Sequence, residues 1–181
     1  MSLVNYLFPK QCVLCSRIGE DICNSCIKKL IHKLPSCYIC KGLNNNYLTH
    51  HKCLEKPIQY FTGWYLSKDL EIKLRKKRLN SLFSIYEYLL RILILYLDIQ
   101  NLVDSSYIYP ILSSKKDEYR LNRFLAKKFN RYGKDKKSIL YIGGYESDIQ
   151  DTIDRTKGLH SKEPFDIYFL VLFELTPKRT D

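Results

Sequence analysis

From about residue 58 onward, the chain alternates between two hydrophobic patterns. Short runs of aromatic and β-branched residues are separated by longer segments in which apolar residues recur three or four positions apart. The runs are typical of β-strands, and the spacings are typical of helices that bury one face. The predicted strands are 60–66, 106–112, 138–142 and 166–174.

Helices are predicted between these strands. Ser67 is suited to cap the first helix, and Asp69 and Glu71 place negative charge in its first turn, where the helix dipole favours it. The last strand is an unbroken apolar run, as expected for a strand that is buried on both faces. Strands that alternate with helices predict an α/β fold with a doubly wound parallel sheet. The helices are expected at 68–79, 81–97, 120–131 and 149–156, with a turn at 143–148.

The first 53 residues carry a different pattern, which is built on cysteine. Ligand pairs separated by two residues are typical of zinc sites, because two such pairs supply four donors around one metal ion. A disulfide framework is the alternative, but seven cysteines is an odd number, and this spacing suits structural disulfides poorly. The predicted ligands of two closed zinc sites are Cys12, Cys15, Cys23, Cys26, Cys37, Cys40, His50 and Cys53.

Two features of these sites remain open in the sequence. His51 follows His50 directly, so either histidine could be the ligand; His50 is preferred because it repeats the two-residue spacer of the other pairs. Consecutive pairs are expected to share a metal, although an interleaved arrangement, with the first and third pairs sharing one ion, is also compatible with the spacing. A closed site of this kind usually holds a fold together.

The distribution of cysteine predicts two domains, a double zinc ribbon at 1–57 and an α/β domain at 58–181. The first is too short to bury much core, so metal binding must supply much of its folding free energy, on the order of 10 kcal/mol per structural zinc. No apolar stretch reaches the ~20 residues that cross a bilayer, so no membrane span is expected. Reduced thiols and the lack of an export signal favour the cytoplasm. The oligomeric state stays open.

The net charge of +11 favours polyanionic partners such as nucleic acid or phosphorylated small molecules. A generally lysine-rich composition would give the same charge without any such partner. The densest basic run is Arg75, Lys76, Lys77 and Arg78, which is predicted to contact phosphate or, alternatively, to form a solvated helix end.

The order of these motifs resembles the ComF family, bacterial competence-associated proteins with an N-terminal double zinc ribbon and a phosphoribosyltransferase domain. Residues 7–15, Leu-Phe-Pro-Lys-Gln-Cys-Val-Leu-Cys, are similar to the family's entry into its first zinc site. Residues 49–53, Thr-His-His-Lys-Cys, resemble the T-H-x-x-C of some members. Residues 109–123 resemble a degenerate form of three successive family features, the P-x-P-L motif, a basic loop and the R-G-F-N-Q motif. The resemblance covers nearly the whole chain and implies a truncated phosphoribosyltransferase-like sheet.

The resemblance also locates a phosphate loop, and this loop is degenerate. In the family, an apolar strand ends in two acidic residues that bind ribose, and a threonine- and glycine-rich loop before a helix holds the phosphate. Here Gly143 and Gly144 replace the acidic pair, and Ser147 and Asp148 open the segment that replaces the loop. Asp148 and Asp151 add negative charge where a dianion would dock, and only about fifteen residues separate Arg123 from Ile139. No catalytic residue is predicted.

Three functions are compatible with these features. The first is a zinc-binding ComF-like protein related to competence and DNA uptake that binds single-stranded DNA or a DNA-handling protein. The second is a residual phosphoribosyltransferase, in which Gly143, Gly144 and Ser147 cradle phosphoribosyl pyrophosphate with magnesium. In that case the pyrophosphate would be neutralised by Lys115, Lys116 and Arg120, which are candidate phosphate contacts in either function. The third is a purely structural subunit.

Overall fold

The structure is a computed structural model of the 181-residue chain. It describes residues 9–30, 32, 34–44, 46–53, 58–75, 79–130, 136, 138–145, 149–160 and 166–175.

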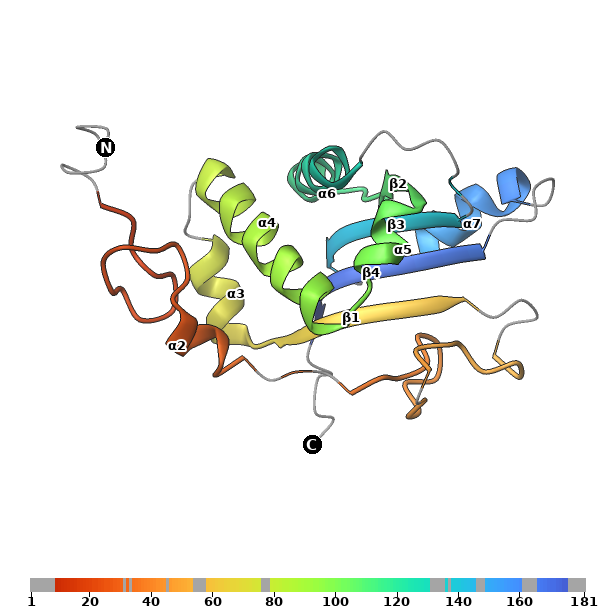
Figure 1. Ribbon diagram of the computed structural model, residues 1–181, viewed down its shortest axis with the longest axis horizontal. Coiled ribbons are helices and arrows are strands. Elements are labelled where there is room, and N and C mark those ends of the chain that lie inside the picture. The colour runs from red at the N-terminus through yellow and green to blue at the C-terminus, as the bar shows by residue number, and fades with distance from the viewer. Residues whose placement is uncertain are drawn as a thin grey trace.

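A four-stranded parallel sheet forms the centre of the molecule (Figure 1). The strands lie in the order β1-β4-β3-β2, so β4, the last strand in the sequence, lies between β1 and β3. This position explains the unbroken apolar run of β4, because neighbouring strands cover both its edges and side chains pack on both its faces. The strands are β1 (Gln59–Leu66), β2 (Ser106–Pro110), β3 (Ser138–Tyr145) and β4 (Asp166–Leu175).

Helices cover both faces of the sheet, which confirms the predicted α/β architecture (Figure 1). On β3, Leu140 and Ile142 belong to a buried cluster with α4 and α6, whereas Tyr141 between them belongs to a second cluster with α7. This alternation follows from the two-residue period of a strand. The helices are α3 (Lys68–Arg75), α4 (Leu79–Tyr96), α5 (Gln100–Asp104), α6 (Lys116–Phe129) and α7 (Ile149–His160).

Several boundaries differ from the prediction. Helix α3 ends at Arg75 and not at 79, α4 begins at Leu79 and not at 81, and α7 extends to His160 and not to 156. Helix α6 begins at Lys116 and not at Arg120, because Asp117 and Glu118 supply a favourable acidic first turn. Strand β3 continues through Tyr145 where a turn was expected, and β2 ends at Pro110. Helix α5 was not predicted, because its five residues are too few to establish a period.

The cysteine-containing region lies along the α/β domain in two separate loops (Figure 1). The first loop, which leads into the short helix α2 (Asn24–Ile27), lies beside α3 and α4, and the second lies along β1. Cys12, Val13 and Ile22 of the first loop belong to the same buried cluster as residues of α3 and α4. The N-terminal region therefore shares its core with the sheet and its helices.

No helix within the described ranges has both the length and the apolar character that crossing a membrane requires.

Candidate metal centres

The structure brings the eight predicted ligands together in two groups of four. Within each group, every ligand atom lies within 4.8 Å of the others. The pairs are consecutive and not interleaved, and the histidine is His50 and not His51, whose side chain is exposed. The first group is Cys12, Cys15, Cys23 and Cys26, and the second is Cys37, Cys40, His50 and Cys53.

A tight turn positions the first ligand pair. The backbone N–H of Cys12 donates to the carbonyl of Arg17 at 2.8 Å, and the N–H of Ser16 donates to the carbonyl of Cys12 at 2.8 Å. Ser16 adopts a positive φ of 62°, which lets the chain reverse directly after Cys15. We call this segment, residues 11–18, the first knuckle.

The second pair of the first group sits at the start of α2. Cys23 precedes the helix and Cys26 lies in it, so both thiols point toward the first knuckle. The N–H of Cys23 donates to the sulfur of Cys12 at 3.4 Å, and the sulfurs of Cys15 and Cys23 are 3.7 Å apart. The first group is thus built from a turn and a short helix.

The same turn recurs twenty-five positions later at 36–43, which we call the second knuckle. Here the backbone N–H of Cys37 donates to the carbonyl of Gly42 at 2.8 Å. The backbone N–H of Lys41, which has a φ of 58°, donates to the carbonyl of Cys37 at 2.9 Å. Isolated antiparallel bridges close the knuckles at equivalent positions, Gln11–Ile18 and Ser36–Leu43. Sequence reasoning missed this internal repeat, although the two C-x2-C turns and the apolar residue three positions after each were visible.

His50 closes the second group. Its Nδ1 atom lies 3.2 Å from the sulfur of Cys40, and its N–H donates to the sulfur of Cys37 at 3.4 Å. Gly42 lies against this ring, since a Cβ there would be 3.4 Å from both the Cys40 sulfur and the His50 ring. Cys53 completes the group from a turn in which its N–H donates to the His50 carbonyl at 2.8 Å.

The thiols of each group differ in acidity. Burial raises the pKa of Cys12, but backbone hydrogen bonds from Cys23, Cys15 and Leu14 lower it to about 6. Burial likewise raises the pKa of Cys37, and backbone hydrogen bonds from Cys40, His50 and Ile39 lower it to about 6. One thiolate therefore forms readily in each group.

One other thiol in each group, that of Cys26 or Cys53, resists ionisation. Burial raises the pKa of Cys26 to about 12, with the neighbouring thiols adding to the effect. Desolvation and the neighbouring Cys37 and Cys40 raise the pKa of Cys53 to about 11. A cation at the centre of either group would offset this repulsion, because metal ions bind thiolates and displace their protons.

The first knuckle is fastened to α3. Lys73 of that helix donates from Nζ to the carbonyl of Leu14 at 3.2 Å, between the two ligands of the turn. Lys10 and Asp21 form an ion pair at 2.7 Å that links the start of the knuckle to the segment before α2.

The second knuckle is fastened to the sheet. Tyr38 packs edge-on against Tyr60 of β1, with ring centroids 5.5 Å apart. Lys41 Nζ lies 3.4 Å from Oε1 of Glu174, a carboxylate at the end of β4 that is only 4% exposed. Thr49, next to the ligand His50, exchanges two 2.9 Å hydrogen bonds with Ile58, directly before β1. Each knuckle therefore holds a different part of the α/β domain.

A third contact joins the cysteine-containing region to the sheet and its helices through His32, which lies between the two knuckles in the sequence. Trp64 of β1 donates from Nε1 to Nε2 of His32 at 3.2 Å, and the His32 ring stacks on Tyr96 at 4.4 Å. Partial burial lowers the pKa of His32, and a backbone hydrogen bond to Gly63 opposes that effect.

The predicted phosphate loop begins inside β3. Gly143 and Gly144 are buried in the strand, where Gly143 pairs with Val171 of β4. A Cβ at Gly143 would meet Ile111 at 2.8 Å, and one at Gly144 would meet Tyr86 at 2.8 Å. Apolar side chains thus press directly on the backbone where the family resemblance implies two carboxylates. Ser147 and Asp148 lie outside the described residues.

Asn122 of α6, which was not among the predicted site residues, contacts the carboxyl ends of β2 and β3. It is 1% exposed, donates from Nδ2 to the carbonyl of Ile111 at 2.9 Å and accepts from the N–H of Gly144 at 2.9 Å. It therefore ties the ends of β2 and β3 together. The signal available in the sequence was the place of Asn122 in the segment that resembles the family's R-G-F-N-Q.

The basic residues that were predicted to contact phosphate lie in two parts of the chain, at the end of α3 and at the start of α6. Arg75 is the last residue of α3, and Lys76, Lys77 and Arg78 lie outside the described residues. The others are gathered at the start of α6, where Lys115 pairs with Glu118 at 2.9 Å, Arg120 lies 3.7 Å from Asp117, and Lys116 is exposed.

Two clusters of soft donors are thus the chemical centres that the described residues present. No protein-family model matches the chain, and neither a curated protein nor a solved structure matches it.

Proposed function

We propose that this protein is a zinc-binding, ComF-like protein in which two structural zinc ions fasten an α/β domain that contacts nucleic acid or a DNA-handling protein. The observation that carries the proposal is the meeting of all seven cysteines and His50 in two groups of four ligands.

The donor set favours zinc over other common metals. Seven thiols and one imidazole suit a borderline-soft ion, whereas magnesium and calcium prefer oxygen ligands. Two thiolates bound tetrahedrally to zinc lie about 3.8 Å apart, given a Zn–S distance of ~2.3 Å. The 3.7 Å between the sulfurs of Cys15 and Cys23 fits this geometry. Four protein ligands leave no open position, so both ions are structural.

The zinc proposal is tested by counting metal per folded chain. Native mass spectrometry of the protein purified under reducing conditions should give two zinc ions per chain. Cys12→Ser and Cys37→Ser should each lose one ion and retain the other. A folded chain with no bound metal would remove the proposal.

Phosphoribosyl transfer is not part of the proposed activity. The support is the crowding of Gly143 and Gly144 by Ile111 and Tyr86, which leaves no side chain there to hold ribose hydroxyls. Calorimetry with phosphoribosyl pyrophosphate and magnesium should give no binding heat at millimolar ligand. Saturable binding would instead support a residual phosphoribosyltransferase.

The proposed partner follows from charge and the proposed compartment from thiol chemistry. A net charge of +11 favours a polyanion such as single-stranded DNA, in keeping with the competence and DNA-uptake role of the family that the chain resembles. Thiolate ligands need a reducing environment to stay free for metal, so we place the protein in the cytoplasm. Binding of a labelled DNA strand that weakens as salt rises would support the partner, and salt-independent or absent binding would exclude it.

A further inference from the structure

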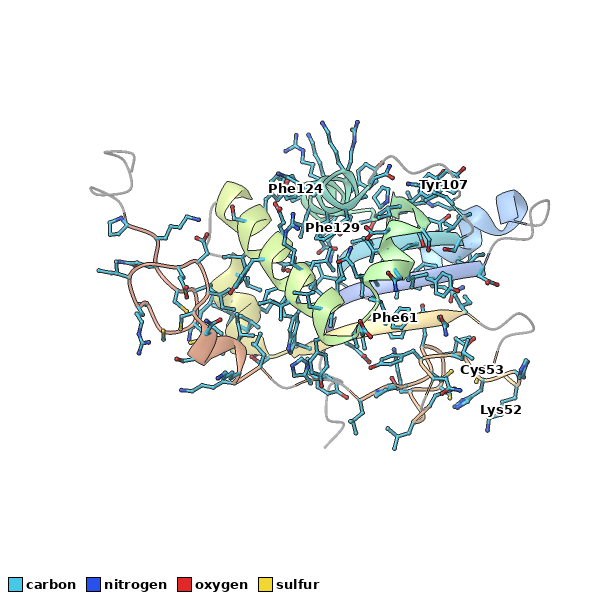
Figure 2. All side chains as sticks on the ribbon, in the orientation of Figure 1. Lys52, Cys53, Phe61, Tyr107, Phe124 and Phe129 are labelled. Carbon is cyan, nitrogen blue, oxygen red and sulfur yellow. The ribbon has the colours of Figure 1, made fainter. Side chains whose placement is uncertain are left out.

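Helix α6 has one buried face and one strongly basic face. Leu121, Asn122, Leu125, Ala126 and Phe129 point into the protein. The opposite face carries exposed cations spaced four, three and four residues apart, which is the spacing of a single stripe along a helix. In Figure 2, nitrogen-tipped side chains extend from α6 away from the sheet. The stripe consists of Lys116, Arg120, Arg123 and Lys127.

Most of these cations have no acidic partner among the residues that the structure describes. Within the described part of the chain, no carboxylate lies within 4 Å of the side-chain nitrogens of Lys116, Arg123 or Lys127. Arg120 is 3.7 Å from Asp117, but both side chains are more than half exposed, and such pairs are weak in water. The stripe therefore presents positive charge that the protein itself leaves largely uncompensated.

The helix dipole does not account for the stripe. Lys127 lies in the last turn of α6, where a cation stabilises the helix. Lys116 is the first residue of the helix, where the dipole disfavours positive charge, and Arg120 lies beyond the first turn, where the dipole contributes little. A stripe that runs through both ends is thus better explained by a ligand than by helix stability.

We propose that the outer face of α6 is the surface that contacts the phosphate backbone of a nucleic acid. This inference rests on the proposed function and identifies the surface that performs it. The stripe from Lys116 to Lys127 is about 16 Å long at 1.5 Å per residue, enough to follow several successive phosphates. Cations facing a polyphosphate release condensed counterions, which makes such binding strongly dependent on salt.

The recognition is of phosphate and not of bases. Base stacking needs exposed rings, and the aromatic residues of α6 are buried or half-buried. Phe124 stacks on Phe83 of α4, with centroids 4.7 Å apart, and Lys128 covers the same ring at 5.4 Å. Binding through this face is therefore independent of nucleotide sequence.

The test compares two double variants that each lower the net charge by two. Arg123→Gln with Lys127→Gln removes half of the stripe, whereas Lys68→Gln with Arg155→Gln removes two exposed cations from α3 and α7. The zinc-loaded full-length chain is titrated with a fluorescent 20-nucleotide single strand and with the corresponding duplex over a series of salt concentrations. Circular dichroism and zinc content establish that both variants are folded.

The stripe variant should bind more weakly, and the slope of log affinity against log salt should fall in magnitude by about 1.4 on the single strand, from ~0.7 per lost phosphate contact. The control variant should keep the slope of the unaltered protein. Equal losses in both variants, or no loss in the stripe variant, would overturn the α6 surface alone. No binding of either DNA by the unaltered protein would overturn the nucleic-acid function and this surface with it.

Discussion

At the scale of single residues, the edge of the sheet where the family resemblance implies ribose binding is shaped by packing. The family resemblance implies an acidic pair where Gly143 and Gly144 stand, but the sequence alone could not show why glycine is required there. The structure supplies the reason, because Ile111 and Tyr86 occupy the space that side chains would need.

Gly144→Ala should therefore destabilise the protein. The new methyl group would meet the Tyr86 ring at 2.8 Å, and Tyr86 is fully buried, so the ring has little freedom to move away. Overpacking of this kind costs about 1–3 kcal/mol. Urea unfolding followed by circular dichroism measures the loss, with Ser114→Ala in an exposed loop as the control. An unchanged midpoint for Gly144→Ala would show that the contact is not tight.

His32 should make stability fall in mild acid. Its pKa in the folded protein is lowered, so between that value and its ordinary 6.5 the unfolded chain binds more protons than the folded one. The contribution of neutral His32 is present above about pH 6.5 and is lost as the pH falls through this window.

His32→Gln keeps an acceptor for the Trp64 N–H and removes the titration. The unfolding free energy of the unaltered protein minus that of this variant should decrease when the pH is lowered from 7.5 to 5.5. All other ionisable groups are the same in both proteins, so their effect cancels in this difference. If this difference does not change with pH, titration of His32 does not affect the stability of the protein.

At the scale of elements, most of the fold follows from local pattern. The helix that starts after Ser67 was predicted from its cap and its acidic first turn, and the Ser67 hydroxyl does accept a hydrogen bond from the N–H of Leu70 at 3.2 Å. The start of α6 was missed because apolar periodicity begins only at Leu121, and the helix opens with three charged residues, Lys116, Asp117 and Glu118.

Ser67→Ala should weaken α3 and the protein with it. The substitution leaves a backbone N–H of the first turn without its side-chain acceptor, a loss of about 1 kcal/mol. Ser67→Asp, which restores an acceptor of the same reach, should recover most of the stability. Thermal unfolding compares the three proteins, and equal stability of the alanine and aspartate variants would argue against capping by Ser67.

At the scale of the whole molecule, the sequence could not reveal how the cysteine-containing loops meet the α/β domain. Ligand types were predictable from C-x2-C spacing, but the choice between consecutive and interleaved pairs depends on the path of the chain between them. The contacts of Lys73 with Leu14 and of Lys41 with Glu174 join residues 59 and 133 positions apart, and no local pattern encodes such distances.

Removal of metal should therefore destabilise the α/β domain as well as the knuckles. Release of the second knuckle would separate Lys41 from the nearly buried carboxylate of Glu174, and release of the first would expose apolar residues of the shared core. Excess chelator should lower the thermal midpoint of the whole protein, and added zinc should restore it. Chelation that leaves the main unfolding transition unchanged would mean that the sheet and its helices are stable without the metal sites.

The proposed metal centres consist of two zinc ions that are bound by seven thiolates and one imidazole. X-ray absorption at the zinc edge tests this ligand set most directly, because it counts the atoms bound to the metal. Seven sulfurs and one nitrogen shared by two ions predict an average shell of about 3.5 sulfurs at ~2.3 Å and 0.5 nitrogen at ~2.0 Å. A shell dominated by oxygen or nitrogen, or one in which solvent takes the place of a protein ligand, would rule out two closed zinc sites with these ligands.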